Sequence, residues 1–529
     1  MNSLEALAWA QSWTALAFLF ALGAIVGSFL NVVVYRLPLG KGIVTPPSAC
    51  PRCETVLRWN DNVPILGWIF LRGRCRYCRS KISPEYMIVE LVVALLFAFV
   101  AAAWFLRPSP LSLLGVDVNA LRPEWAADGM VRMWPMLGQV YVLIAALVAI
   151  TLIDARTYMI PLALPWVVTA VAFVAHPLHA AWVQWKYGGL RVSEFAWTIA
   201  TPTGPVLVAT FAGMLGLIVS IVLLHLRVMP RSFADYEQWE AEATARAEAR
   251  SKLPHPPGSA TPPAAHDTAL GPTMRRVFLL TGPALALMFA GFAVGMTANR
   301  PFTGMFAGMG VGLVIGMILR RIVAPAPTSP EGLGEDDPIW LAYPHARREM
   351  LKEVLFLALP VAAFVGAWLL VSRGGTPPGA ADPPLWMRAL AGSLLGYMAG
   401  GGVVWAVRIL GSLAFGKEAM GLGDVHLMAA VGAVLGWIDP VVAFFVAPAI
   451  GLGWVIVSWS IAKSRGMAGS ALPFGPHLAA ASVLVVLLKP VVVESILALI
   501  LARPINVPSG PNGPRGVVRS RYHVSIRIT

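Results

Sequence analysis

The feature that most limits how this chain can fold is a series of long, continuous apolar runs. Runs of about 18 or more such residues recur along the chain, and each is long enough to cross a hydrocarbon layer of roughly 30 Å as a helix. Only helices and closed barrels satisfy their backbone groups in lipid, and continuous rather than alternating runs favour helices. We therefore predict an all-α polytopic membrane protein whose surroundings are a lipid bilayer.

We expect about twelve transmembrane helices. Their centres fall near Phe20, Leu95, Ile144, Val168, Leu215, Leu285, Val311, Phe364, Gly400, Val431, Phe445 and Val486. The composition agrees, because 57% hydrophobic residues, 13% charged residues and a mean hydropathy of +0.70 lie outside the usual range of soluble domains. The first run, from about Trp13 to Val34, is too long for a signal-peptide core and should remain as a helix.

Basic residues are concentrated in the loops beside the apolar runs. The net charge is +13, but these residues form no module interleaved with aromatics, so we expect no nucleic-acid partner. The polar stretch from Tyr35 to Tyr86 is rich in Arg and Lys, which predicts a cytoplasmic location by the positive-inside rule and an N-terminus on the outside. Alternating the spans from there places Asp154 and Asp424 on the same, cytoplasmic face.

The runs and the breaks between them divide the chain into six parts. We expect a first transmembrane helix (1–34), a cytoplasmic loop with four cysteines (35–86), a transmembrane core (87–178), a region with about four extra helices and linkers (179–386), a second part of the transmembrane core (387–503) and a basic flexible tail (504–529).

The four cysteines of the chain form two C-x-x-C pairs in one polar loop. These are Cys50, Cys53, Cys75 and Cys78. Four thiolates at this spacing can surround a zinc ion in a tetrahedron, and a site closed by four protein ligands is structural rather than catalytic. The alternative is a pair of disulfides or redox chemistry, but a cytoplasmic loop lies in a reducing compartment. We predict a small zinc-knuckle loop ordered by the ion.

Asp154 ends the third apolar run. An acidic group at the mouth of a helix bundle is costly unless it has a partner or a function. Its structural interpretation is an ion pair with Arg156 or a cap on the next helix, and this segment alone slightly favours that interpretation.

Asp424 changes that balance. It follows Gly421-Leu422-Gly423 and opens an apolar span, so it could also be a helix N-cap. Gly421 and Gly423, however, let another backbone approach closely, as a protease must allow its extended substrate to do. Two carboxyl groups held together would share one proton, so that one serves as base and the other as acid.

Other candidate catalytic residues have less support. Ser28 has no base motif nearby, and no H-E-x-x-H zinc helix is present. His426 and His477 could be ligands or bases, although interhelical hydrogen bonding is the more common role of such residues.

Several segments, in order along the chain, resemble the type IV prepilin leader peptidase/N-methyltransferase family, the bacterial branch of the GxGD aspartic peptidases. The segments are Gly27–Pro38, the two cysteine pairs with Asp61–Pro64 and Arg72–Arg74 between them, Ser83–Tyr86, Val89–Leu91, Asp154 with Ile160-Pro161, Gly421–Asp424 and Pro473–Pro476. The resemblance covers about Ala21–Val168 and resumes near Leu390, and Leu162 stands where an acidic residue is common in the family.

The resemblance implies a function and partners. A member would be an aspartic endopeptidase of the bacterial inner membrane that cleaves prepilin-like precursors after the leader glycine, with Asp154 and Asp424 as the catalytic pair and a pilus or type II secretion machinery as partner. Many members then methylate the new N-terminus with S-adenosylmethionine, a cofactor to which spacing alone assigns no residue here.

Two other interpretations stay open on the sequence. One is a non-enzymatic membrane assembly or transport protein in which the zinc loop is a docking module. The other is a GxGD peptidase for a different single-span substrate, with the extra helices as a substrate gate.

Overall fold

A computed structural model describes residues 3–115, 117–188, 197–236, 346–374, 382–416, 418–465 and 474–500, with isolated positions between 238 and 315. Contacts divide the chain into two units, and the description below concerns the first, Met1–Ala269 with Pro325–Val493. The second unit comprises Leu270–Ala324 and Glu494–Thr529.

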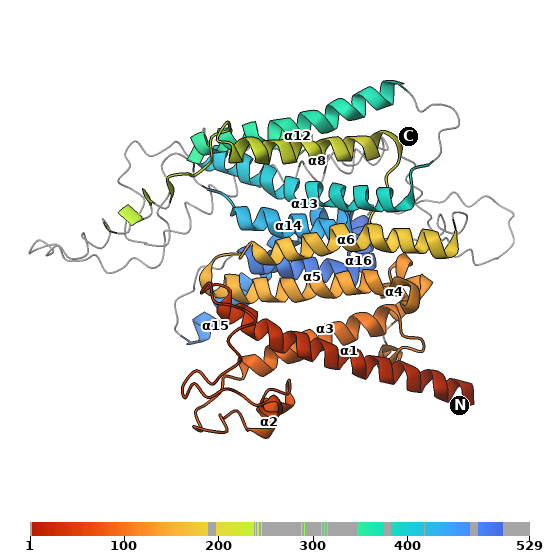
Figure 1. The fold of residues 1–529 in the computed structure, drawn as a ribbon, viewed down its shortest axis with the longest axis vertical. Helices are drawn as coiled ribbons and strands as arrows, with labels where there is room; N and C mark the ends of the chain where they lie inside the picture. Colours follow the sequence, from red (N-terminus) through yellow and green to blue (C-terminus); the bar gives the residue numbers. More distant parts are fainter. Residues whose placement is uncertain are drawn as a thin grey trace, which may run out of the picture. The chain divides into compact units, whose positions relative to one another are not determined.

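Helices form the regular structure of the described residues (Figure 1). They are α1 (Ser3–Arg36), η1 (Trp59–Asp61), α2 (Leu66–Phe70), α3 (Glu85–Trp104), η2 (Pro110–Leu114), α4 (Val118–Leu121), η3 (Glu124–Asp128), α5 (Met130–Thr157), α6 (Ala163–Tyr187), α8 (Gly204–His225), α12 (Ala346–Gly374), α13 (Leu385–Phe415), α14 (Leu422–Leu435), α15 (Ile438–Arg465) and α16 (Phe474–Ile500). The predicted all-α fold is confirmed.

Eight helices of the described part are long and apolar enough, by length and composition, to cross a membrane. They are α1, α3, α5, α6, α8, α12, α13 and the Ile438–Val455 part of α15. The predicted spans near Leu285 and Val311 fall in a stretch of which only isolated positions are described, and the predicted tail 504–529 lies outside the described residues. The other predicted centres all lie inside helices.

Helix α14 is shorter than the span predicted around Val431. Its 14 residues extend about 21 Å, less than a hydrocarbon layer. The helix stops at Gly436, whose φ of +88° suits glycine. It packs closely on α13, where the carbonyl of Gly432 approaches Gly396 so tightly that a Cβ there would lie 2.0 Å from the oxygen. This contact leaves α14 inside the bundle.

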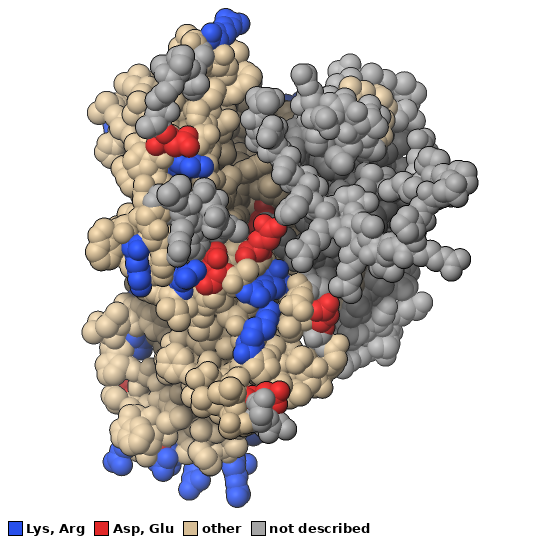
Figure 2. All heavy atoms as spheres, turned by 90° about the vertical axis from the view of Figure 1, so that its right-hand side faces the viewer, with Lys and Arg blue, Asp and Glu red and all other residues tan. Residues whose placement is uncertain are grey.

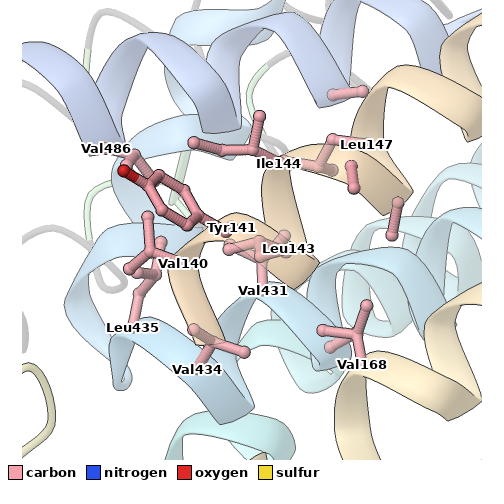
Figure 3. Close-up of a cluster of buried hydrophobic side chains, with 14 of the residues drawn as sticks. Val140, Tyr141, Leu143, Ile144, Leu147, Val168, Val431, Val434, Leu435 and Val486 are labelled. Carbon is pink, nitrogen blue, oxygen red and sulfur yellow. The ribbon is translucent and has the colours of Figure 1, made fainter. Parts of the chain in front are cut away.

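Helix α5 lies at the centre of the hydrophobic core. In its most apolar window 72% of the residues are buried, against 6% in α12. Figure 3 shows Val140, Leu143 and Ile144 of α5 among side chains from α6, α14 and α16, including Val431 and Val486. Packing along most of α5 therefore fixes the position of its C-terminal end.

Helices α1 and α3 pack closely where glycines of α1 lie against the backbone of α3. A Cβ on Gly23 would lie 2.7 Å from the Cα of Ala94, and one on Gly27 would lie 2.7 Å from the Cα of Glu90. One turn further on, the side-chain amide of Asn31 donates to the Tyr86 carbonyl at 3.0 Å. The i, i+4 glycine spacing brings the two backbones together, so the cysteine loop between the helices starts and ends at one place.

The two ends of the bundle differ in what they carry. Figure 2 views the molecule from the end where α1 begins; basic side chains project along its lower edge, and acidic and basic side chains lie together near the centre of the view. At the other end α1 leads into the cysteine loop, and α5 ends there beside the start of α3 (Figure 1). The Arg156 guanidinium joins these last two helices by an ion pair with Glu85.

Candidate active site

Asp154 lies in the last turn of α5 and is 5% exposed. The helix ends because Tyr158 adopts a left-handed conformation and returns its N–H to the Asp154 carbonyl at 2.9 Å. Arg156 does not pair with this carboxyl group but with Glu85. The ion pair that the sequence offered as the structural role of Asp154 is therefore absent.

Asp424 lies in the first turn of α14 and is 8% exposed. Gly421 is the N-cap, so Asp424 is the third residue of the helix rather than its cap. Its carboxylate accepts a hydrogen bond from the Gly421 backbone, in the manner of the acidic residue of a capping box. The backbone of the glycine motif thus sets the position of the carboxyl group.

The fold brings Asp154 and Asp424 to one site, where their carboxyl groups interact electrostatically. Two glycines make the approach possible. A Cβ on Gly475, at the start of α16, would lie 2.3 Å from Oδ2 of Asp154, and one on Gly423 would lie 2.8 Å from the Cβ of Ile160. Three segments far apart in sequence meet here, namely the end of α5 with the loop after it, the start of α14 and the start of α16.

The rival residues have other surroundings. Ser28 donates to Glu90 on the neighbouring helix. The ring of His426 lies 5.6 Å from that of Trp166, and the ring of His477 faces Gly451. Both histidines take part in contacts between helices.

The two C-x-x-C pairs form two similar tight turns. Cys50 N–H donates to the Thr55 carbonyl at 3.0 Å, and Cys75 N–H donates to the Ser80 carbonyl at 2.9 Å. An isolated β-bridge closes each turn, Ala49 with Val56 and Arg74 with Lys81. The repeat of one backbone pattern at both pairs indicates that the turns serve the same purpose.

The four cysteine sulfurs fit a tetrahedral metal ion. They lie within 4.8 Å of one another and all four thiols are free. The Sγ atoms of Cys50 and Cys78 are 3.9 Å apart, close to the edge of about 3.8 Å that four bonds of 2.3 Å imply. Hydrogen bonds from the backbone of Cys53 and Arg52 lower the pKa of Cys50 to about 6, which favours the thiolate that binds metal. This cluster can hold a metal ion.

Two buried acidic residues tie the cysteine loop to its surroundings. Asp61 accepts from Arg76 Nε at 2.5 Å and from the Tyr77 hydroxyl at 3.2 Å. Burial alone would raise the pKa of Asp61, but these partners hold it below its ordinary value of 3.8. Glu90 accepts from the backbone N–H of Ile65 at 2.6 Å and so joins the loop to α3.

A groove of about 510 Å³ lies between α1 and the loop. Its polar lining includes Ser28, Arg36 and Asn62. S-adenosylmethionine presents a carboxylate, but the guanidinium of Arg36 already donates to the carbonyls of Gly42 and Pro46, at 3.2 and 2.7 Å. The one basic group of this groove is therefore engaged, and we assign S-adenosylmethionine no residue.

Sequence reasoning missed three residues of these sites. Glu90 is a single charge inside an apolar run, a signal that marks it as a functional or structural candidate. Ile160 and Gly475 belong to motifs noted above, but only the fold shows that Ile160 covers Gly423 and that Gly475 makes room for Asp154.

Residues 21–104 match the sequence model described as Bacterial Peptidase A24 N-terminal domain. The prepilin leader peptidase/N-methyltransferase of Myxococcus xanthus is 58% identical over 80 residues, 15% of this chain and 24% of the relative. That of Klebsiella pneumoniae is 36% identical over 151 residues, 27% of this chain and 54% of the relative. The type 4 prepilin-like proteins leader peptide-processing enzyme of Escherichia coli is 40% identical over 131 residues, which are 20% of this chain and 49% of the relative.

The chain thus spans about half, or less, of the length of these curated relatives. No solved structure matches. The matching domain contains the four cysteines, and the resemblance expected from the motifs is confirmed: this chain is similar to the prepilin leader peptidase/N-methyltransferases.

Proposed function

We propose that this chain is a membrane aspartic endopeptidase that removes the leader peptide from type IV prepilin-like precursors. The observation that carries the proposal is the meeting of two buried carboxyl groups, Asp154 and Asp424, at one end of a helical bundle. Burying acidic residues inside a membrane bundle costs free energy. Among the described residues neither aspartate has an ion-pair partner that would offset this cost.

Cleavage follows from the chemistry of the pair. Two buried carboxyl groups that act on one another electrostatically can share one proton. The ionised one takes a proton from the attacking water, while the protonated one donates a hydrogen bond to the oxygen of the scissile carbonyl. The roles then exchange as the amine leaves.

The surroundings of the pair suit a peptide substrate. Gly421 and Gly423 present backbone without side chains next to Asp424, and Gly421 is exposed. An extended peptide can lie along such a backbone and be held by main-chain hydrogen bonds. A precursor with one apolar segment could reach this site from the bilayer, with its leader at the membrane surface.

The charge of the cysteine loop supports the location that we propose for the site. Arg52, Arg58, Arg72, Arg74 and Arg76 are all exposed there. The positive-inside rule assigns such a loop to the cytoplasm. We propose that the protein lies in the bacterial inner membrane, that the aspartate pair opens toward the cytoplasm, and that a pilus or type II secretion machinery receives the product.

Zinc is the metal we propose for the four cysteines. Four thiolates this close repel one another, and a divalent cation between them removes that repulsion while fixing the two turns. Its role would be structural, because four protein ligands leave no position open for a substrate.

The test is cleavage by the purified protein in detergent. We expect one new N-terminus, after the leader glycine of a pilin-like precursor, detected by mass spectrometry. Asp154→Asn and Asp424→Asn should each abolish it while retaining the melting temperature of the wild type within a few degrees. If both variants process the precursor normally, the pair has no catalytic role, and if the wild type processes none of a panel of pilin-like precursors, an assembly or transport role becomes the better account.

N-methylation is a second candidate activity, favoured by the names of the relatives. We derive no step of it from this chain. Transfer of a labelled methyl group from S-adenosylmethionine to the N-terminus of cleaved pilin would support it, and cleavage without any transfer would remove it.

A further inference from the structure

A buried ionic cluster lies between α12, α13 and the turn that leads to Asp424, and the reaction above does not use it. Its centre is Arg408 of α13, which is 2% exposed in an otherwise apolar stretch. A guanidinium at such a place is costly unless its N–H groups all find acceptors. The identity of those acceptors therefore indicates what the residue is for.

The first acceptor is Glu353 of α12, which is itself 4% exposed. Arg408 donates to its carboxylate through Nη2 at 3.0 Å and through Nε at 3.1 Å. The indole N–H of Trp405 donates to the same carboxylate at 2.7 Å. This two-pronged pairing fixes the plane of the guanidinium, which a single point charge would leave free to rotate.

The remaining nitrogen of Arg408 reaches the turn before α14. Nη1 donates both to the carboxylate of Glu418 and to the carbonyl of Met420. One helical turn along α13, the Ser412 hydroxyl accepts from the Ala419 backbone N–H at 3.0 Å. Side chains of α13 thus hold this turn at several points.

The turn before α14 also sets the position of Asp424. Met420 directly precedes Gly421, and the backbone of Gly421 donates to the Asp424 carboxylate. Moving the Met420 carbonyl would move Gly421 and with it that carboxylate. A continuous set of contacts therefore runs from Glu353 through Arg408 to Asp424.

We propose that Arg408 is a positioning residue for the aspartate pair and that Glu353 holds it in place. Glu353 lies in the region 179–386 that we predict is added to the family's core, so the added helix α12 is part of the support of the active site. The inference rests on the proposed peptidase function, to which it assigns a role for the added helices.

The first experiment measures precursor cleavage by Arg408→Gln and Arg408→Lys in the full-length protein. The matched control is Arg388→Gln, the same change on the same helix, where the arginine bonds to Thr201 rather than to the turn. We expect kcat to fall about 10- to 100-fold in Arg408→Gln with KM within about twofold, because a displaced catalytic group slows the reaction without changing substrate binding. Arg408→Lys keeps the positive charge but loses the paired N–H groups of the guanidinium, so its kcat should lie between those of Arg408→Gln and the wild type. The kcat of Arg388→Gln should match that of the wild type.

The second measurement does not depend on activity. Amide hydrogen exchange in the peptide around 411–424 should be faster than in the wild type for Arg408→Gln and for Glu353→Gln, and unchanged for Arg388→Gln. If Arg408→Gln fails to fold, the pair Glu353→Met with Arg408→Met replaces both buried charges by apolar side chains and gives the same two readouts.

A wild-type kcat with unchanged exchange in Arg408→Gln or in the methionine pair would overturn the positioning role and leave the peptidase function standing. A rise in KM alone would also overturn it, since that result indicates substrate binding. Absence of cleavage by the wild type would reject the peptidase function, while the exchange measurement would still decide whether Arg408 and Glu353 hold the turn.

Discussion

Gly475→Ala should uncouple the aspartate pair without unfolding the protein. An ideal Cβ at this position would lie 2.3 Å from Oδ2 of Asp154, whereas ordinary contact begins at 3.4 Å, so the two atoms must separate by 3.4 − 2.3, or about 1.1 Å. The carboxyl group is the freer partner, because Gly475 belongs to the first turn of a helix. A displacement of about 1 Å at a catalytic group can cost on the order of 100-fold in rate.

The assay compares kcat for precursor cleavage in detergent, with the melting temperature as a measure of folding. The matched control is Gly138→Ala on α5, the helix that carries Asp154, where an added Cβ meets no atom within 4 Å. We expect Gly138→Ala to keep full activity with equal or slightly higher stability, since alanine favours helix. If Gly475→Ala cleaves as fast as the wild type, the carboxyl group of Asp154 is not confined as described or does not act in the reaction.

Three further changes test other parts of the account. Gly27→Ala should lower the melting temperature, at a cost of about 1–3 kcal/mol, because its Cβ would meet the Glu90 backbone at 2.7 Å; an unchanged melting curve would contradict the close crossing of α1 and α3. Elemental analysis should find one zinc per wild-type chain and none in Cys75→Ser, whereas two disulfides by mass spectrometry would overturn the metal site. Arg156→Gln should retain cleavage and lose at most about 1 kcal/mol of stability, because its ion pair with Glu85 is half exposed; complete loss of activity would show that Arg156 serves the pair after all.

The apolar runs were enough to predict the helices, because length and continuity alone decide whether a segment can cross a membrane. They overstated α14, where Gly421 and Gly436 limit the helix to 14 residues. The close packing of α14 against Gly396 and Gly400 of α13 is a separate, long-range feature that no local pattern reveals.

The candidate residues were predictable where a motif concentrates them, as in the cysteine pairs and the glycine segment before Asp424. Their supporting contacts were not. Arg408 and Glu353 are 55 residues apart in sequence, and the bond between them exists only because α12 packs beside α13. A single charge in an apolar run predicts that the residue has a partner, but only the fold shows which residue that partner is.

The claim that the two aspartates act as one unit is tested most directly by comparing single and double substitutions. Residual cleavage rates would be measured for Asp154→Asn, for Asp424→Asn and for the two combined, in protein shown to be folded. Because the groups share one task, we predict that each single change lowers the rate as far as the double change does. Losses that multiply, or substantial cleavage by either single variant, would contradict the account.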